Sequence, residues 1–90
     1  MSFKTLDVVV LERDLPASSL KRGDLGTVVE VYEPDGLEVE FVTASGKTEA
    51  LLTLKTADVR PVGDSDLMAV RPYARAVSGS AAGRPTDGPA

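Results

Sequence analysis

Residues 25–41, LGTVVEVYEPDGLEVEF, decide the fold, because they describe two strands joined by a tight turn. Apolar and polar residues alternate on both sides of the turn, and a period of two is typical of a half-buried strand. The turn Glu33–Gly36 has proline at its second position and glycine at its fourth, which are residues that tight turns favour. The stretch therefore predicts a β-hairpin, with Leu37, Val39 and Phe41 facing a core.

Short strands are also predicted on both sides of the hairpin, where β-branched and apolar runs are separated by turn residues. In chain order they are residues 6–11, 48–54, 59–62 and 66–71. Residues 55–58 favour a single helical or 3₁₀ turn, and no longer helix is expected. The sequence therefore predicts an all-β fold, a small SH3-like (KOW-like) β-barrel of five to six short strands, since closure removes exposed sheet edges. The competing OB-fold normally has a helix between its third and fourth strands, and the sequence predicts none.

The chain has 90 residues, which is enough for one small domain. Its net charge is −4. Residues 1–73 are predicted to form the barrel domain. Residues 74–90, rich in Ala, Gly, Ser and Pro, are predicted to be a flexible tail, because they bury too little surface to offset their ordering entropy. No apolar run approaches the length of a membrane span, and the N-terminus has no signal-peptide pattern. We therefore expect a cytoplasmic protein that binds no membrane.

The absence of histidine and cysteine excludes most site chemistry. Without them the chain builds no thiolate or imidazole zinc site, no disulfide and no Ser-His or Cys-His nucleophilic pair. We expect no catalytic, cofactor-binding or metal-binding residues and predict that the protein is not an enzyme. Gly23 and Gly26 are interpreted as structural, needing positive φ or close backbone approach, because a phosphate cradle normally opens a helix rather than a strand.

Two sets of surface residues are candidates for binding. If Leu6, Val8 and Val10 face the core together with Val29 and Val31, the intervening apolar residues of the same strands point outward and call for a cover. That cover is either internal, from residues 13–20 or 67–70, or a partner chain. With the carboxylates expected on the barrel exterior, the predicted partner-binding set is Val9, Leu11, Val28, Glu30, Tyr32, Glu38, Glu40 and Leu51. Val42 is also expected to point outward.

The second set is basic and consists of Lys21, Arg22 and Lys47. Loops of this kind contact nucleic-acid backbones in some SH3-like barrels, usually beside aromatic stacking platforms. The chain has only two Phe, two Tyr and no Trp, and its negative charge opposes nonspecific nucleic-acid binding. Nucleic-acid binding is therefore the less favoured alternative.

Four motifs give the chain a family resemblance. They are Asp7–Leu11, Leu20–Val29, Glu38–Phe41 and Leu52–Pro61. Through them residues 3–71 resemble DUF4926, a bacterial family of unknown function. The resemblance implies a small barrel and a bacterial source, and it implies no activity.

The leading interpretation is thus a non-enzymatic protein–protein interaction module, such as the partner or antitoxin-like protein of a neighbouring gene product. The expected partner is another protein or a second copy of the chain. The alternative is a KOW-like nucleic-acid-associated module.

Overall fold

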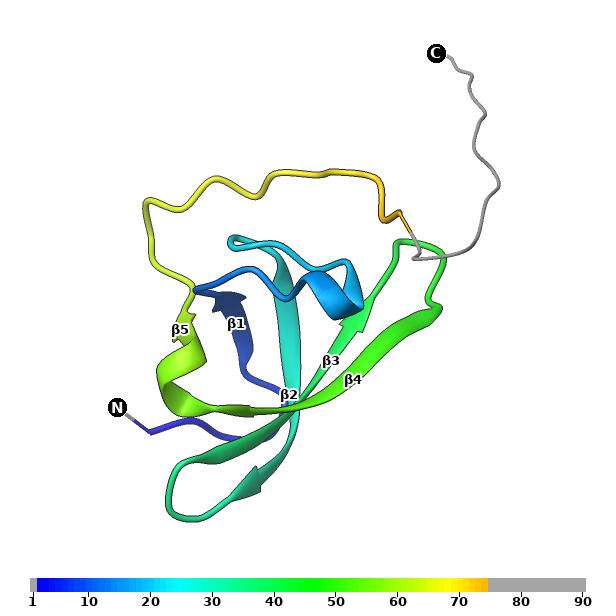
Figure 1. Cartoon of the computed structure of the whole chain (residues 1–90). Helices are drawn as coiled ribbons and strands as arrows, with labels where there is room; N and C mark the ends of the chain where they lie inside the picture. Colours follow the sequence, from blue (N-terminus) through cyan, green and yellow to red (C-terminus); the bar gives the residue numbers. More distant parts are fainter. Residues whose placement is uncertain (1, 75–90) are drawn as a thin grey trace.

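The computed structural model describes residues 2–74, and this part of the chain is all-β (Figure 1). Five antiparallel strands form one sheet in the order β4-β3-β2-β1-β5. The elements are β1 (Val8–Leu11), η1 (Pro16–Ser18), β2 (Leu25–Tyr32), β3 (Gly36–Val42), β4 (Thr48–Lys55), η2 (Thr56–Asp58) and β5 (Val59–Pro61). The predicted all-β class and the predicted hairpin are confirmed, and β2 has the predicted bounds. Neither 3₁₀ turn in the described residues is long or apolar enough to cross a lipid bilayer.

The sheet curls because its two edge strands, β4 and β5, are joined only by the three residues of η2. The backbone N–H of Thr56 donates to the carbonyl of Asp35 at 2.9 Å, and the N–H of Glu12 donates to the carbonyl of Asp58 at 2.8 Å. This turn is therefore fastened to the β2–β3 turn and to the chain that follows β1. Figure 1 shows the strands bent around a common interior, which is consistent with the predicted small barrel.

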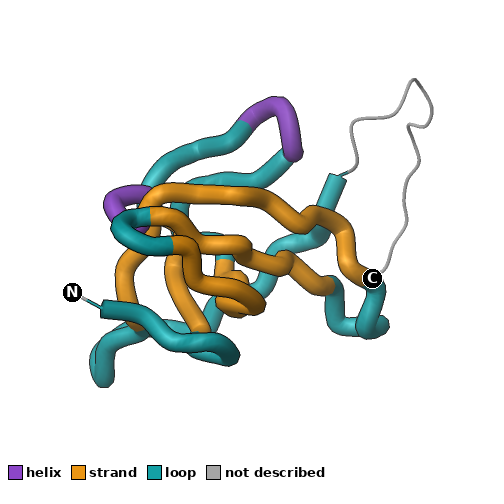
Figure 2. Tube along the Cα trace, turned by 90° about the horizontal axis from the view of Figure 1, so that it is seen from below, coloured by secondary structure: helices purple, strands orange, loops and turns teal. Residues whose placement is uncertain are grey.

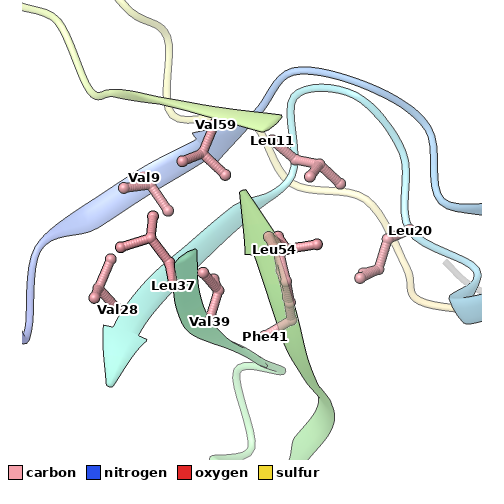
Figure 3. Close-up of a cluster of buried hydrophobic side chains, with 9 residues drawn as sticks. All are labelled: Val9, Leu11, Leu20, Val28, Leu37, Val39, Phe41, Leu54 and Val59. Carbon is pink, nitrogen blue, oxygen red and sulfur yellow. The ribbon is translucent and has the colours of Figure 1, made fainter. Parts of the chain in front are cut away.

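The concave face of the sheet carries the hydrophobic core. Its buried side chains are Val9, Leu11, Leu20, Val28, Leu37, Val39, Phe41, Leu54 and Val59, and Figure 3 shows them gathered between the strands. Every strand contributes at least one of them. Burying a valine or leucine side chain contributes roughly 1.5–3 kcal/mol, so this cluster is the main source of stability.

The structure corrects the face predicted for β1. The prediction began the strand at Leu6 and placed Leu6, Val8 and Val10 inside. The strand begins at Val8 instead, Leu6 has a φ of 77° and is 75% exposed, and the side chains that face the core are those of Val9 and Leu11. Three consecutive valines give no alternation from which the face could be read.

The face predicted for the first half of β2 is wrong for a different reason. Val28 pairs with Val39 and Glu30 pairs with Glu38, so Val29 is an extra residue in a β-bulge. A bulge shifts the side-chain alternation by one position. Val28 before the bulge and Val31 after it therefore both face the core, and Val28 is buried rather than outward.

Gly26 allows β2 to lie close against β3. A Cβ atom at this position would lie 2.5 Å from Cγ1 of Val39 and 2.9 Å from Cε2 of Phe41, which is too close for any side chain. Gly23, in the turn before β2, has a φ of 98°, a conformation that glycine adopts without strain. The structural interpretation of both glycines is confirmed.

The long connection between β1 and β2 folds back on itself. The backbone N–H of Leu15 donates to the carbonyl of Leu20 at 2.8 Å, and the N–H of Leu20 returns a bond to Leu15 at 3.1 Å. The N–H of Gly23 donates to the carbonyl of Leu11 at 2.8 Å. These bonds direct Leu20 into the core and place Asp24 at the surface, where it holds the last part of the described chain.

Residues 62–74, which we call the strap, follow β5 without regular secondary structure. The strand predicted for residues 66–71 is not formed. Figure 1 shows the strap, in yellow, passing over the β1–β2 connection toward the β3–β4 turn, and Figure 2 shows loops surrounding the group of strands. Val10 is buried, as predicted, but on the outer face of the sheet, where it lines a cavity together with strap residues. The predicted tail lies outside the described residues except for Ala74.

Candidate functional site

Five of the predicted partner-binding residues lie together on the convex face of β2, β3 and β4. We call them the outer patch: Glu30, Tyr32, Glu38, Glu40 and Leu51. Strand register brings them together, because Glu30 pairs with Glu38 across β2 and β3, and Glu40 pairs with Leu51 across β3 and β4. Tyr32 is 45% exposed and Leu51 is 54% exposed. The outer patch thus combines three carboxylates with two large, half-exposed side chains.

Glu38 lies at the centre of the outer patch and is held by two hydroxyl groups. The Thr53 hydroxyl donates to its Oε1 at 2.9 Å, and the Tyr32 hydroxyl donates to the same oxygen at 3.3 Å. Glu40 is held in a similar way by the hydroxyl of Thr48. These bonds fix the direction of both carboxylates on the surface.

The outer patch has a negative potential that the structure only partly relieves. Glu30 and Glu38 lie directly opposite each other, and like charges in that position destabilise a sheet. Desolvation, together with the carboxylates of Glu38 and Glu30, raises the pKa of Tyr32 above its usual value. Its hydroxyl therefore stays protonated as a donor, and the nearby charge favours a cation at this site.

Three residues of the predicted partner-binding set do not belong to any surface. Val9, Leu11 and Val28 have no exposed surface and lie in the core. Val8, which was expected inside, is 46% exposed and pairs with Thr27 on the outer face. For Val9 and Leu11 the missing information was the start of β1, which the run of valines does not reveal, and for Val28 it was the bulge in β2.

The basic residues Lys21, Arg22 and Lys47 lie in two separate turns, before β2 and between β3 and β4. The Arg22 backbone N–H donates to Asp14 at 2.9 Å, and its Nη2 lies 3.9 Å from Oε1 of Glu12. Acidic neighbours thus offset part of the positive charge at this end of the molecule.

A cavity of about 370 Å³ that was not predicted lies between these two turns and the strap. Its lining is mainly apolar and includes Leu20, Leu25, Phe41 and Tyr73. The strap provides one wall, and the strap is held by contacts between residues far apart in the sequence. Local sequence patterns therefore could not predict the cavity.

Asp24 and Arg71 form a charged pair in the cavity wall. Partial burial tends to raise the pKa of Asp24, but hydrogen bonds from Arg71 and from the backbone of Lys21 outweigh it and hold the pKa below its usual value. The same pairing raises the pKa of Arg71. Both groups are thus charged and mutually neutralised.

Clustered carboxylates are a ligand set that divalent metal ions can use. Among residues 2–74, no group of three or more carboxylates is arranged to hold a metal ion. Hydrogen bonding to neighbouring hydroxyls, described above, accounts for the orientation of Glu38 and Glu40.

A family model described as "Domain of unknown function (DUF4926)" matches residues 5–61, well over half of the chain. The match confirms the resemblance drawn from the sequence motifs. It ends with the last residue of β5, so it includes all five strands and excludes the strap. No curated protein and no solved structure matches the chain.

Proposed function

The chain belongs to the DUF4926 family, and from its fold and surface we propose that it is a non-enzymatic protein–protein interaction module whose binding surface is the outer patch. The observation that carries the proposal is the position of Tyr32 and Leu51, each about half exposed, beside Glu38 and Glu40. Apolar side chains rimmed by polar groups are typical of protein interaction sites, and tyrosine is enriched among the residues that dominate binding energy.

The chemistry of the outer patch favours a partner that presents lysine or arginine next to apolar side chains. Three carboxylates on one face of a chain with net charge −4 attract such a partner and orient it. A cation between Glu30 and Glu38 would also relieve their repulsion. An antitoxin-like role requires a partner encoded by a neighbouring gene. A basic protein would suit the outer patch as such a partner.

The proposal is tested by capture from a lysate of the source cell on the immobilised full chain, followed by affinity measurement with the captured protein. Replacing Leu51 by serine, or Glu38 by lysine, should weaken binding about tenfold or more, as expected for central interface residues. Glu33→Lys and Leu67→Ser are matched controls, since they make the same chemical changes at exposed positions outside the outer patch. Circular dichroism verifies that each variant is folded. A captured protein that binds the outer-patch variants as tightly as the unmodified chain would contradict the proposal.

A KOW-like nucleic-acid-associated role is the second candidate. The observation in its favour is that the turns carrying Lys21, Arg22 and Lys47 border the same cavity, next to Tyr73. The acidic neighbours of Arg22 weaken this candidate. An electrophoretic shift with single-stranded and duplex nucleic acid at low salt tests it, because binding through a few cations should disappear as salt rises.

A further inference from the structure

The edge of β4 that faces away from β3 has no partner strand. Among the described residues, β4 lies at the end of the strand order and pairs only with β3. Residues 50–54 of this strand contain neither a charged residue nor a proline, which are two of the features that protect edge strands from further pairing. An unprotected edge of this kind can accept an extended segment of another protein as an additional strand.

The hydrogen bonds at the end of β4 show which of its backbone groups point toward the free edge. Gly36 pairs with Lys55, and the N–H of Thr56 donates to the carbonyl of Asp35 at 2.9 Å. In an antiparallel ladder this bond between the flanking residues marks Gly36 and Lys55 as a non-hydrogen-bonded pair, and such pairs alternate with hydrogen-bonded pairs. Counted back from Lys55, every second residue of β4 therefore has an N–H and a carbonyl that point away from β3.

Leu51 and Thr53 are the residues in the middle of β4 whose backbone groups point away in this manner. The register between β3 and β4 is unbroken from Lys55 back to Ala50, so the alternation holds at both residues. Within the part of the chain that the structure describes, their outward N–H and carbonyl groups make no hydrogen bond, and both residues are exposed. The N–H of Lys55 donates instead to Asp58 at 3.0 Å, which ends the free edge.

The side chains beside this edge specify the kind of sequence that fits it. A residue added directly opposite Leu51 faces the convex side, in line with Glu40. A residue added opposite Thr53 faces the same side, in line with Glu38. Neighbouring strands lie about 4.8 Å apart, so the added strand lies roughly 10 Å from β3, a gap that a lysine and a glutamate side chain bridge together. Between these two residues, the added strand faces the inner side next to Leu52, which is apolar and only partly buried.

We propose that the outer patch binds an extended segment of a partner protein, which adds as an antiparallel strand beside β4 and carries basic and apolar side chains in alternation. Every strand pair of the described sheet is antiparallel, and antiparallel pairing is slightly more stable per residue than parallel pairing. Backbone bonds to Leu51 and Thr53 provide affinity, whereas the basic side chains, facing Glu38 and Glu40, provide specificity. This inference rests on the proposed function and adds the mode of binding.

The probe is an acetylated and amidated peptide of sequence VKVKVKV, and NMR of the full chain is the readout. We expect amide exchange with water to slow at Leu51 and Thr53 when the peptide binds. The N–H of Leu52 already points to β3, so its exchange should not change.

Methylated peptides test the backbone bonds directly. In an antiparallel pair the lysines lie opposite Leu51 and Thr53, so their N–H groups donate to β4. Methylation of the lysine amide nitrogens should therefore weaken binding about tenfold or more. Methylation of the valine amide nitrogens is the matched control and should change binding little, because those N–H groups point to solvent.

A charge reversal in the chain tests the side-chain contacts. Glu40→Lys should weaken peptide binding about tenfold, because it places a lysine where the peptide's lysines lie. Glu33→Lys makes the same change at an exposed position in the β2–β3 turn and should weaken binding much less. Circular dichroism verifies that both variants are folded.

The inference and the proposed function fail in different ways. A peptide that binds without slowing exchange at Leu51 and Thr53, or that binds equally well with methylated lysine amides, would overturn strand addition and leave the outer patch as a surface that binds through side chains alone. Absence of peptide binding at about 1 mM would also overturn strand addition. The proposed function fails instead when the captured protein binds the outer-patch variants as tightly as the unmodified chain.

Discussion

Arg71 and Asp24, 47 positions apart in the sequence, form an ion pair with two contacts, Nε to Oδ1 at 2.8 Å and Nη2 to Oδ2 at 2.5 Å. The pair fastens the strap to the turn that precedes β2. The sheet is held by backbone ladders and a buried apolar core, whereas the strap is held by side-chain contacts at a few positions. Tyr73 adds one more, as its hydroxyl donates to the carbonyl of Ser18 at 2.7 Å. The strap should therefore detach more easily than any strand.

Arg71→Gln should release the end of the strap and leave the sheet folded. The change removes charge-assisted hydrogen bonds to a mostly buried carboxylate, and we expect the free energy of unfolding to fall by about 1–2 kcal/mol. Urea denaturation measures the loss, and NMR signals of residues 67–74 should shift relative to the unmodified chain while those of β3 stay in place. Arg13→Gln is the control, because Arg13 pairs with Asp58 through a side chain that is 57% exposed, and such pairs contribute at most about 1 kcal/mol. Equal losses for the two variants would contradict the special role of Arg71.

Acid should detach the strap at both anchors. Hydrogen bonds from Arg60 and from the backbone of Gly63 lower the pKa of Asp66 to about 2, and the pKa of Asp24 also lies below its usual 3.8. A carboxylate whose pKa is lower in the folded chain than in the unfolded chain stabilises the fold above the unfolded value. That contribution is lost as the pH falls through the folded value.

The strap should therefore be attached above about pH 4 and should detach progressively as the pH falls toward 2. Amide and side-chain NMR signals of residues 62–74 report the change, with β3 as the internal reference. The other charged groups at the anchors are Glu12 near Arg60 and Lys21 near Asp24. Strap signals that stay unchanged down to pH 2 would show that the ion pairs do not hold it.

The bulge in β2 predicts opposite behaviour for two adjacent valines. Val28→Ala removes two methyl groups from a fully buried side chain and should cost about 2 kcal/mol or more of unfolding free energy. Val29→Ala alters the extra, only partly buried residue of the bulge and should cost much less. Thermal or urea unfolding distinguishes them, and a larger loss for Val29→Ala would mean that the opposite face of β2 is buried.

Glu30→Lys should stabilise the chain, because it replaces a pair of like charges by a pair of opposite charges. The expected gain is about 0.2–1 kcal/mol, and it should decrease as salt is added. The pKa of Tyr32 should also fall toward 10.0, which an NMR titration of the Tyr32 ring signals measures. Glu33→Lys makes the same change of charge in the β2–β3 turn and should show neither effect. A loss of stability in Glu30→Lys would mean that Glu30 and Glu38 do not repel each other.

The strands that the sequence predicted well are those with clean local patterns. Apolar and polar residues alternate along β3 without interruption, so Leu37, Val39 and Phe41 were assigned to the core correctly. The turn residues before β3 predict the hairpin. The turn before β5 could also be predicted from its local sequence. Glu30, Tyr32, Glu38, Glu40 and Leu51 were placed on the outer face, and the structure adds that register brings them together.

Local patterns by themselves determined the all-β class, the hairpin and the acidic surface of this protein. Tertiary structure alone decided which face of β1 and β2 is buried, because the bulge at Val29 exists only through pairing with β3, and the valines of β1 suit either face. It also decided the course of the strap. The energy of an ion pair depends on the distance between its charges in space. Arg60 and Asp66 are already close in the sequence, whereas Arg71 and Asp24 come close only after the sheet has formed.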